Sequence, residues 1–182
     1  MRSISLTTAI WMAIVAFPAT LAATTLERLS MNDLSDQSTV VVVGKVLNGG
    51  GELKDGAVYT HYQLSVSDVW KGSAGSQLDV YVPGGTASGF RQLVPGAPVL
   101  TVGSEYVVFL WVGRSGRAQI MGLSQGLFAI AADSASTAKY AERPGVKEMM
   151  VDPLTGRPVT DETVRMKAAD LKALVRKRQG DQ

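Results

Sequence analysis

The clearest pattern along the chain is an alternation of apolar and polar residues in its middle third, within and just before the stretch YTHYQLSVSDVWKG. A period of two predicts a β-strand with one buried face and one solvent-exposed face. The face predicted to be buried carries Val58, Thr60, Tyr62, Leu64 and Val66. The exposed face carries Tyr59, His61, Gln63, Ser65 and Ser67. The alternation slips at Val69 and Trp70, which predicts a bulge or a strand end near Ser67 and Asp68.

Two other segments have the composition of buried strands. Val40 to Val43 are consecutive β-branched residues and predict a strand buried on both faces, while the following Gly44 predicts a bulge or a sharp bend. The segment EYVVFLWV, residues 105–112, is strongly apolar and is expected at the centre of a sheet. The glycine-rich residues 48–56 are interpreted as a connection, and residues 86–103 as a long loop.

Two weaker segments complete the predicted small barrel. In SQLDVYVPGG the inward positions and the outward positions again alternate, and the Pro-Gly-Gly sequence ends the strand. The inward positions are Leu78, Val80 and Val82, and the outward ones are Asp79 and Tyr81. The segment GLFAIA is expected to be the last barrel strand.

The regions on either side of the strands predict two helices and a hairpin. Ser30 and Asp33 have the spacing of a capping box at the start of a short helix. Residues 132–145 are small and polar and are interpreted as a linker, and residues 152–156 are predicted to turn a hairpin. A C-terminal amphipathic helix is predicted to begin after Thr160 as its N-cap, with basic residues in its last turn. Its apolar stripe comprises Val164, Ala168, Leu171 and Val175.

The first 23 residues have the features of an export signal. Arg2 supplies a positive start, residues 4–17 are mostly apolar, and small residues precede a cleavage point after Ala22 or Ala23. The apolar-rich part has about 14 residues, fewer than the ~20 that a membrane-spanning helix needs. We therefore predict a periplasmic or secreted protein that meets the membrane only during export. A retained N-terminal anchor is the alternative.

Composition narrows the classes of function. The chain has 18 Lys and Arg residues against 16 Asp and Glu residues, and removal of Arg2 with the leader leaves 17 against 16. A charge this close to neutral gives no general attraction to nucleic acid. There is no cysteine, so thiolate metal sites, thiol nucleophiles and disulfides are excluded. The roughly 160 residues that follow the leader are enough to form a hydrophobic core without disulfides.

The order of several short motifs resembles a known family. A valine-rich strand with VGKV, then YTHYQLSVSDVWKG, DVYVPGG, GSEYVVFL and GLSQGLF follow one another as in netrin-like domains of the tissue-inhibitor-of-metalloprotease type, found also in exported bacterial proteins. The resemblance covers residues 39–131. It implies a mainly β fold with a small five-stranded OB-like barrel, flanked by a short N-terminal helix and a C-terminal helix. Those inhibitors chelate zinc through an N-terminal cysteine, which this chain lacks, so that mode of inhibition is not implied.

Together these patterns predict a division of the chain into four parts. Residues 1–23 are the signal peptide and residues 24–38 a short helical lead-in. Residues 39–131 form the OB-like barrel domain, and residues 132–182 form a linker, the hairpin and the final helix.

Motifs that carry chemistry are few. Gly122 to Gly126 match G-x-S-x-G, but a strand-like run follows Ser124 and the chain's one histidine lies upstream, so we interpret the match as a barrel turn. The S-x-x-K match from Ser136 to Lys139 lacks its companion motifs. No calcium-loop spacing occurs, and we predict neither a metal site nor a cofactor.

The predicted binding site follows from the resemblance, because OB barrels commonly bind ligands on the outer face of strands two and three. Here that face carries Tyr59, His61, Gln63 and Tyr81. We expect His61 to be a solvated strand residue without an adjacent acid. The favoured function is a non-enzymatic binding module for a protein or peptide, which could serve as accessory or inhibitor of an extracytoplasmic enzyme. The alternatives are a small hydrolase using Ser124 or a carboxylate pair, and an envelope structural protein held by an uncleaved leader.

Overall fold

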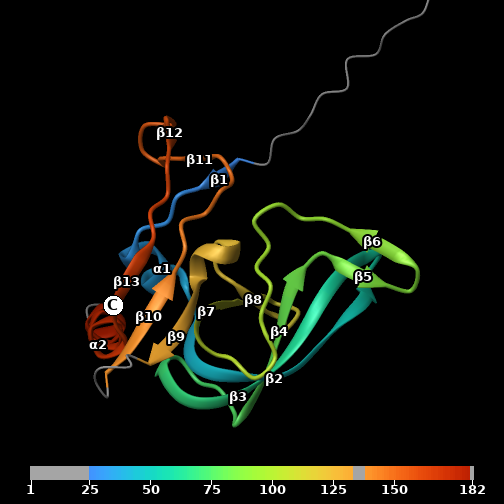
Figure 1. Cartoon of the computed structure of the whole chain (residues 1–182), viewed down its shortest axis with the longest axis horizontal. Helices are drawn as coiled ribbons and strands as arrows, with labels where there is room; N and C mark the ends of the chain where they lie inside the picture. Colours follow the sequence, from blue (N-terminus) through green and yellow to red (C-terminus); the bar gives the residue numbers. More distant parts are fainter. Residues whose placement is uncertain (1–24, 133–137, 181–182) are drawn as a thin grey trace, which may run out of the picture.

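A computed structural model describes residues 25–132 and 138–180, so the predicted leader, the predicted cleavage point and Ser136 lie outside the described residues. The described chain is mainly β with two α-helices, α1 (Met31–Gln37) and α2 (Ala168–Gly180), and a short 3₁₀ helix, η1 (Leu123–Gly126) (Figure 1). The longer strands are β2 (Val40–Lys54), β3 (Ala57–Lys71), β4 (Gln77–Pro83), β7 (Glu105–Val112), β9 (Leu127–Ala132) and β10 (Lys139–Arg143). The shorter ones are β1 (Leu26–Glu27), β5 (Gly85–Ala87), β6 (Phe90–Gln92), β8 (Ala118–Ile120), β11 (Met150–Val151), β12 (Pro158–Val159) and β13 (Val164–Lys167).

Most strands belong to one eight-stranded sheet in the order β13-β10-β9-β7-β2-β3-β4-β8. Strand β8 also pairs with β7, so the five strands β7, β2, β3, β4 and β8 are joined in a partial ring. A clear five-stranded barrel does not form, because β8 has only three residues and pairs with β4 at two of them. The mainly β prediction is therefore confirmed, and the sheet extends beyond the predicted barrel.

The four valines at the start of β2 divide the interior into two cores. Val40 and Val42 lie in the core enclosed by the partial ring, with Tyr62, Leu64 and other side chains. Val41 and Val43 point to the opposite face, into a second core with Phe109 and Phe128. The prediction that this run is buried on both faces is confirmed. Helices α1 and α2 cover the second core, and Figure 1 shows them on the side of the sheet away from β5 and β6.

The hairpin of β2 and β3 is longer than the sequence predicted. The glycine-rich residues 48–56 are not a loop: β2 continues to Lys54, and only Asp55 and Gly56 turn the chain, both with positive φ (53° and 78°). An Asp-Gly pair favours this two-residue hairpin turn. Two of the three glycines before it, Gly49 and Gly51, lie where β3 and β5 approach the strand closely. A Cβ atom on Gly49 would lie 2.5 Å from the Tyr62 ring, and one on Gly51 would lie 1.8 Å from the Thr86 carbonyl oxygen.

The predicted irregularity in β3 is confirmed by its register with β2. Val43 pairs with Asp68 and Gly44 pairs with Val66, so Ser67 is the extra residue of a bulge. The bulge reverses the faces of the following residues and turns Trp70 into the helix-covered core.

The C-terminal third contains more sheet than the sequence predicted. The predicted linker includes β10, which pairs with β9, and β9 in turn pairs with β7 outside the ring. The predicted helix start is also wrong: residues 164–167 form β13 on the edge of the sheet, and helix α2 begins at Ala168. The apolar stripe is divided accordingly, with Leu171 and Val175 buried from the helix and Val164 packed from the strand.

Two smaller predictions have different outcomes. The segment predicted as a long loop, residues 86–103, begins with the two-stranded hairpin β5–β6. The hairpin predicted around residues 152–156 is confirmed, because β11 and β12 pair on either side of it. Strand β1 adds to β11 in parallel, so the N-terminal segment is part of this small sheet.

Ion pairs and a cap hold the two helices against the sheet. Ser30 and Asp33 form the predicted capping box of α1. Arg178 of α2 donates from Nε to Asp36 at 2.8 Å, and Lys172 donates to Asp68 of β3 at 2.5 Å. Burial raises the pKa of Asp68, but hydrogen bonds from Lys172 and Trp70 outweigh it and place the pKa below its ordinary 3.8.

The three consecutive glycines provide a matched test of the hairpin. Gly49→Ala and Gly51→Ala should each lower the free energy of unfolding by about 1–3 kcal/mol, because the added methyl group has no room. Gly50→Ala should be neutral or stabilise by about 0.5–1 kcal/mol, since nothing lies within 4 Å of its Cβ position. Urea unfolding measures all three. Equal effects at the three positions would contradict the register.

Asp68 predicts a pH dependence of stability. A carboxyl group whose pKa is lower in the folded state stabilises fully above its unfolded value, near 3.8, and loses this contribution as pH falls through the folded value. Asp68→Asn should therefore reduce the decline in unfolding free energy between about pH 5 and pH 2. Lys172→Met, which removes the donor, should reduce it as well. Urea unfolding at several pH values measures the slope, and slopes equal to wild type in both variants would refute this role.

Candidate functional site

The predicted binding residues lie together on the outer face of the β3–β4 pair. His61 is paired with Tyr81 across the two strands, and Gln63 is paired with Asp79. Tyr59 follows on the same face, two residues from His61. Cross-strand pairing therefore gathers the four predicted residues, Tyr59, His61, Gln63 and Tyr81, on one surface.

Three aromatic rings form a cluster on this surface. The His61 imidazole stacks on the Tyr81 ring, with centroids 4.9 Å apart and planes at 23°. The Tyr59 ring meets Tyr81 edge-on at 6.4 Å. Stacked and edge-to-face pairs of this kind fix the orientation of each ring. The cluster is thus a preformed aromatic platform at the protein surface.

Two cations that the sequence analysis missed border the platform. Lys54 Nζ lies 5.3 Å from the centroid of the Tyr81 ring, and the Arg117 guanidinium lies 5.5 Å from that of Tyr59. Both distances are within the range of cation–π attraction. Arg117 also pairs with Asp55 at 2.8 Å. No sequence signal identified these cations, because one comes from the far end of the long hairpin and the other from the loop before β8.

His61 differs from its prediction. It is only half-exposed, and its Nε2 lies 2.9 Å from the Asp79 carboxylate, so an acid is adjacent after all. Asp79 was predicted to point outward, but its approach to His61 depends on the register of β3 with β4, which the sequence does not reveal. Gln63 accepts a hydrogen bond of 3.3 Å from Asn48. Both polar residues of the predicted site are therefore held in place.

An open space lies beside the platform on β2. Gly50 is the residue paired with His61, and a Cβ atom there would meet nothing within 4 Å. Any other residue would place a side chain next to the imidazole. The glycine therefore leaves one side of the His61 and Tyr81 pair uncovered.

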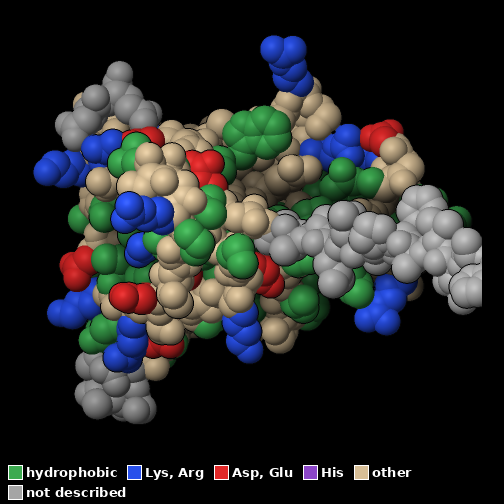
Figure 2. Space-filling view, turned by 90° about the horizontal axis from the view of Figure 1, so that it is seen from above, with side chains coloured by type: hydrophobic (Ala, Val, Ile, Leu, Met, Phe, Trp, Pro, Cys, Tyr) green, Lys and Arg blue, Asp and Glu red, His purple; other side chains and the backbone are tan. Residues whose placement is uncertain are grey.

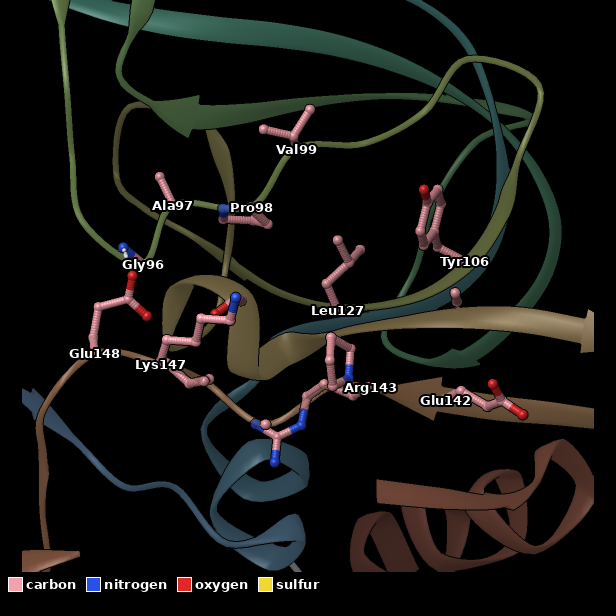
Figure 3. Close-up of a pocket in the computed structure, with 15 residues that line it drawn as sticks. Gly96, Ala97, Pro98, Val99, Tyr106, Leu127, Glu142, Arg143, Lys147 and Glu148 are labelled. Atoms are coloured by element: carbon pink, nitrogen blue, oxygen red, sulfur yellow. Dashed lines mark hydrogen bonds between the residues drawn. The ribbon is translucent and has the colours of Figure 1, made fainter. Parts of the chain in front are cut away.

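A separate cavity of about 360 Å³ contains the serine of the G-x-S-x-G match. Figure 3 shows the segment from Gly96 to Val99 on one side of it and the segment from Glu142 to Glu148 on the other. Glu148 accepts a hydrogen bond of 2.9 Å from the Gly96 amide and so links the two walls. Among the described residues that line this cavity there is no histidine to act as a general base for Ser124, since the chain's one histidine is on β3.

The G-x-S-x-G match forms the turn that the sequence analysis expected, as helix η1, and its neighbouring glutamine holds the N-terminal segment. Gln125 is fully buried, accepts a hydrogen bond of 2.8 Å from the Leu29 amide and donates one of 2.9 Å to the Glu27 carbonyl. The motif therefore has a structural role in the fold.

Arg143 at the cavity wall is also buried. It pairs with Asp161 at 3.1 Å, and both side chains are almost inaccessible to solvent. Its Nε and Nη1 atoms have no hydrogen-bond partner within the described part of the chain, and its guanidinium lies 5.6 Å from the centroid of the Phe128 ring. Figure 3 shows this guanidinium pointing away from Val99 and toward α1.

Within residues 25–132 and 138–180, no group of three or more His, Asp or Glu side chains could hold a metal ion. Neither of the described α-helices combines the length and apolar character needed to cross a bilayer.

Comparison with protein-family models, with curated proteins and with solved structures gives no match for this chain.

Gln125→Leu tests the structural role of the G-x-S-x-G segment. The change leaves the Leu29 amide and the Glu27 carbonyl without partners, so it should lower the free energy of unfolding by about 1–3 kcal/mol. Hydrogen exchange at the Leu29 amide should accelerate more than exchange in β7. Ser124→Ala at the neighbouring position should change neither quantity appreciably. A Gln125→Leu variant as stable as wild type would show that these hydrogen bonds are not needed.

Proposed function

We propose that this chain is an exported, non-enzymatic binding module that recognises a protein or peptide partner through the outer face of β3 and β4. The observation that carries the proposal is the aromatic platform of Tyr59, His61 and Tyr81, bordered by Lys54 and Arg117. Aromatic side chains and arginine are enriched in protein interfaces, and the aromatic ones supply large contact areas with little loss of side-chain freedom.

The arrangement of strands supports an OB-like body beneath this face. The partial ring β7-β2-β3-β4-β8 has the strand number of the partly open OB barrel, and its β3 face is where such barrels bind ligands. The netrin-like resemblance of residues 39–131 leads to the same proposal. In an exported protein of this type, the partner could be an extracytoplasmic enzyme that the module inhibits or assists without zinc chelation.

The composition of the platform favours a protein or peptide over nucleic acid. Each cation at its border is near an opposite charge: Arg117 pairs with Asp55, and Lys54 lies 3.7 Å from Glu52. A nucleic-acid surface requires an excess of unpaired cations along the backbone path. Balanced charges around half-buried aromatic rings instead suit a polar rim around an interface core.

The hydrolase alternative has less support from the geometry. Ser124 lines a cavity with Glu142, Lys147 and Glu148, but the described lining contains no imidazole. The envelope-anchor alternative depends on residues 1–24, which lie outside the described part of the chain. Both alternatives would leave the platform without a role.

The proposed face can be tested by crosslinking in cells that make the protein. Tyr81→Ser and, separately, Gly50→Gln should each reduce the yield of the crosslinked partner about tenfold or more, because one removes the central ring and the other covers its open side. Crosslinked species are purified through the chain and quantified by mass spectrometry.

Tyr140→Ser is the matched control, since Tyr140 is a partly buried tyrosine of β10 whose ring lies 4.3 Å from the Arg165 guanidinium. It should leave the yield unchanged. All three variants are first compared with wild type by circular dichroism. Equal partner yields for wild type, Tyr81→Ser and Gly50→Gln would refute the proposed face, and loss of the partner only in Tyr140→Ser would place recognition on β10.

A further inference from the structure

A second surface, formed by the β5–β6 hairpin and the segment after it, carries exposed apolar side chains. Phe90 is 62% exposed and Leu93 is 77% exposed. Ser88 and Gly89 turn the hairpin with positive φ values, so Phe90 is the first residue after a two-residue turn. Exposed apolar side chains that are contiguous with others mark a contact with a membrane or another molecule.

The neighbouring end of the long β2–β3 hairpin extends the apolar surface. Leu53 and Val58 line a hollow of about 410 Å³ together with Phe90 and Arg91. Arg91 and Leu93 also line a second hollow, of about 270 Å³, with Val99, which is 82% exposed. The two hollows are therefore contiguous through Arg91. We call Leu53, Phe90, Arg91, Leu93 and Val99 the tip patch.

The charge of the tip patch is positive. Arg91 is exposed and forms no ion pair within the described residues. Neither hollow has an acidic residue among its described lining residues. Figure 1 places β5 and β6 at one end of the molecule, and Figure 2 shows hydrophobic, basic and acidic side chains at that end. The patch thus combines projecting apolar groups with one unpaired cation.

We propose that the tip patch docks on the surface of a membrane that contains anionic phospholipid. Phe90 and Leu93 enter the boundary between headgroups and acyl chains, and Arg91 contacts lipid phosphate. A deformable lipid surface can follow both the projecting side chains and the two hollows that they line. An unpaired arginine next to the apolar groups complements anionic headgroups. This inference does not depend on the β3–β4 platform, which is a different surface, and it departs from the expectation that the protein meets the membrane only during export.

Vesicle sedimentation tests the proposal with the purified protein. Wild type should sediment with vesicles of phosphatidylcholine and phosphatidylglycerol in equal amounts, and more weakly with phosphatidylcholine alone. Phe90→Ser with Leu93→Ser should weaken binding to the mixed vesicles about tenfold or more, because the inserted apolar area is lost. Arg91→Gln should weaken it about fivefold.

Leu154→Ser is the control, because Leu154 is 93% exposed in the turn between β11 and β12, which Figure 1 shows at another end of the molecule. It should bind vesicles as wild type does. Tyr81→Ser should also bind normally, so that failure of this proposal and failure of the platform proposal are distinguished. Wild type that stays in the supernatant, or a double variant that binds as tightly as wild type, would overturn the proposal. Loss of a crosslinked protein in the double variant, with no vesicle binding by wild type, would identify the patch as a protein interface instead.

Discussion

Residues 40–43 of β2 and 107–110 of β7 are buried on both faces of the sheet, and the two cores of the molecule pack against this pair of strands. Val40 and Val42 lie inside the partial ring, while Val41 and Val43 face the helices. Val107 to Leu110 of β7 alternate in the same way and are fully buried. One pair of strands therefore separates two cores and belongs to both. A strand of this kind needs an unbroken run of apolar residues, and the sequence supplies one in each strand.

The aromatic platform and the tip patch both lie where strands extend beyond the β2–β7 pair. Strand β2 continues past the two-sided core to Lys54, with small residues where β3 and β5 approach it. This long hairpin places Lys54 beside the Tyr81 ring and leaves Gly50 open next to His61. The same hairpin end contributes Leu53 to the tip patch, beside Phe90 and Arg91 of β6. Parts of both surfaces, one aromatic and one apolar, are thus carried by this long hairpin.

Patterns of burial were predictable from the sequence, and partners across strands were not. The valine run, the alternation of β3 and the bulge at Ser67 were predicted, because each depends on residues close in sequence. The glycines of β2 were misinterpreted as a turn, since glycine disfavours strands except where another chain segment comes close. Residues 164–167 carried apolar positions compatible with helical spacing, and only pairing with β10 makes them a strand. The contact of His61 with Asp79 likewise depends on a register that one sequence does not contain.

Native-state hydrogen exchange measures directly whether the β2–β7 pair unites the two cores. If it does, the amides of Val41 to Val43 and of Val107 to Leu110 exchange only by global unfolding. As denaturant is added, the free energies of hydrogen exchange in the two cores then converge on the same limiting value. The amides to compare are those of β3 and β4 in one core and those of β9 and helix α2 in the other. The contradicting result is that the amides of one core exchange at a distinctly lower free energy while those of the other core stay protected. The two cores would then be units that fold separately.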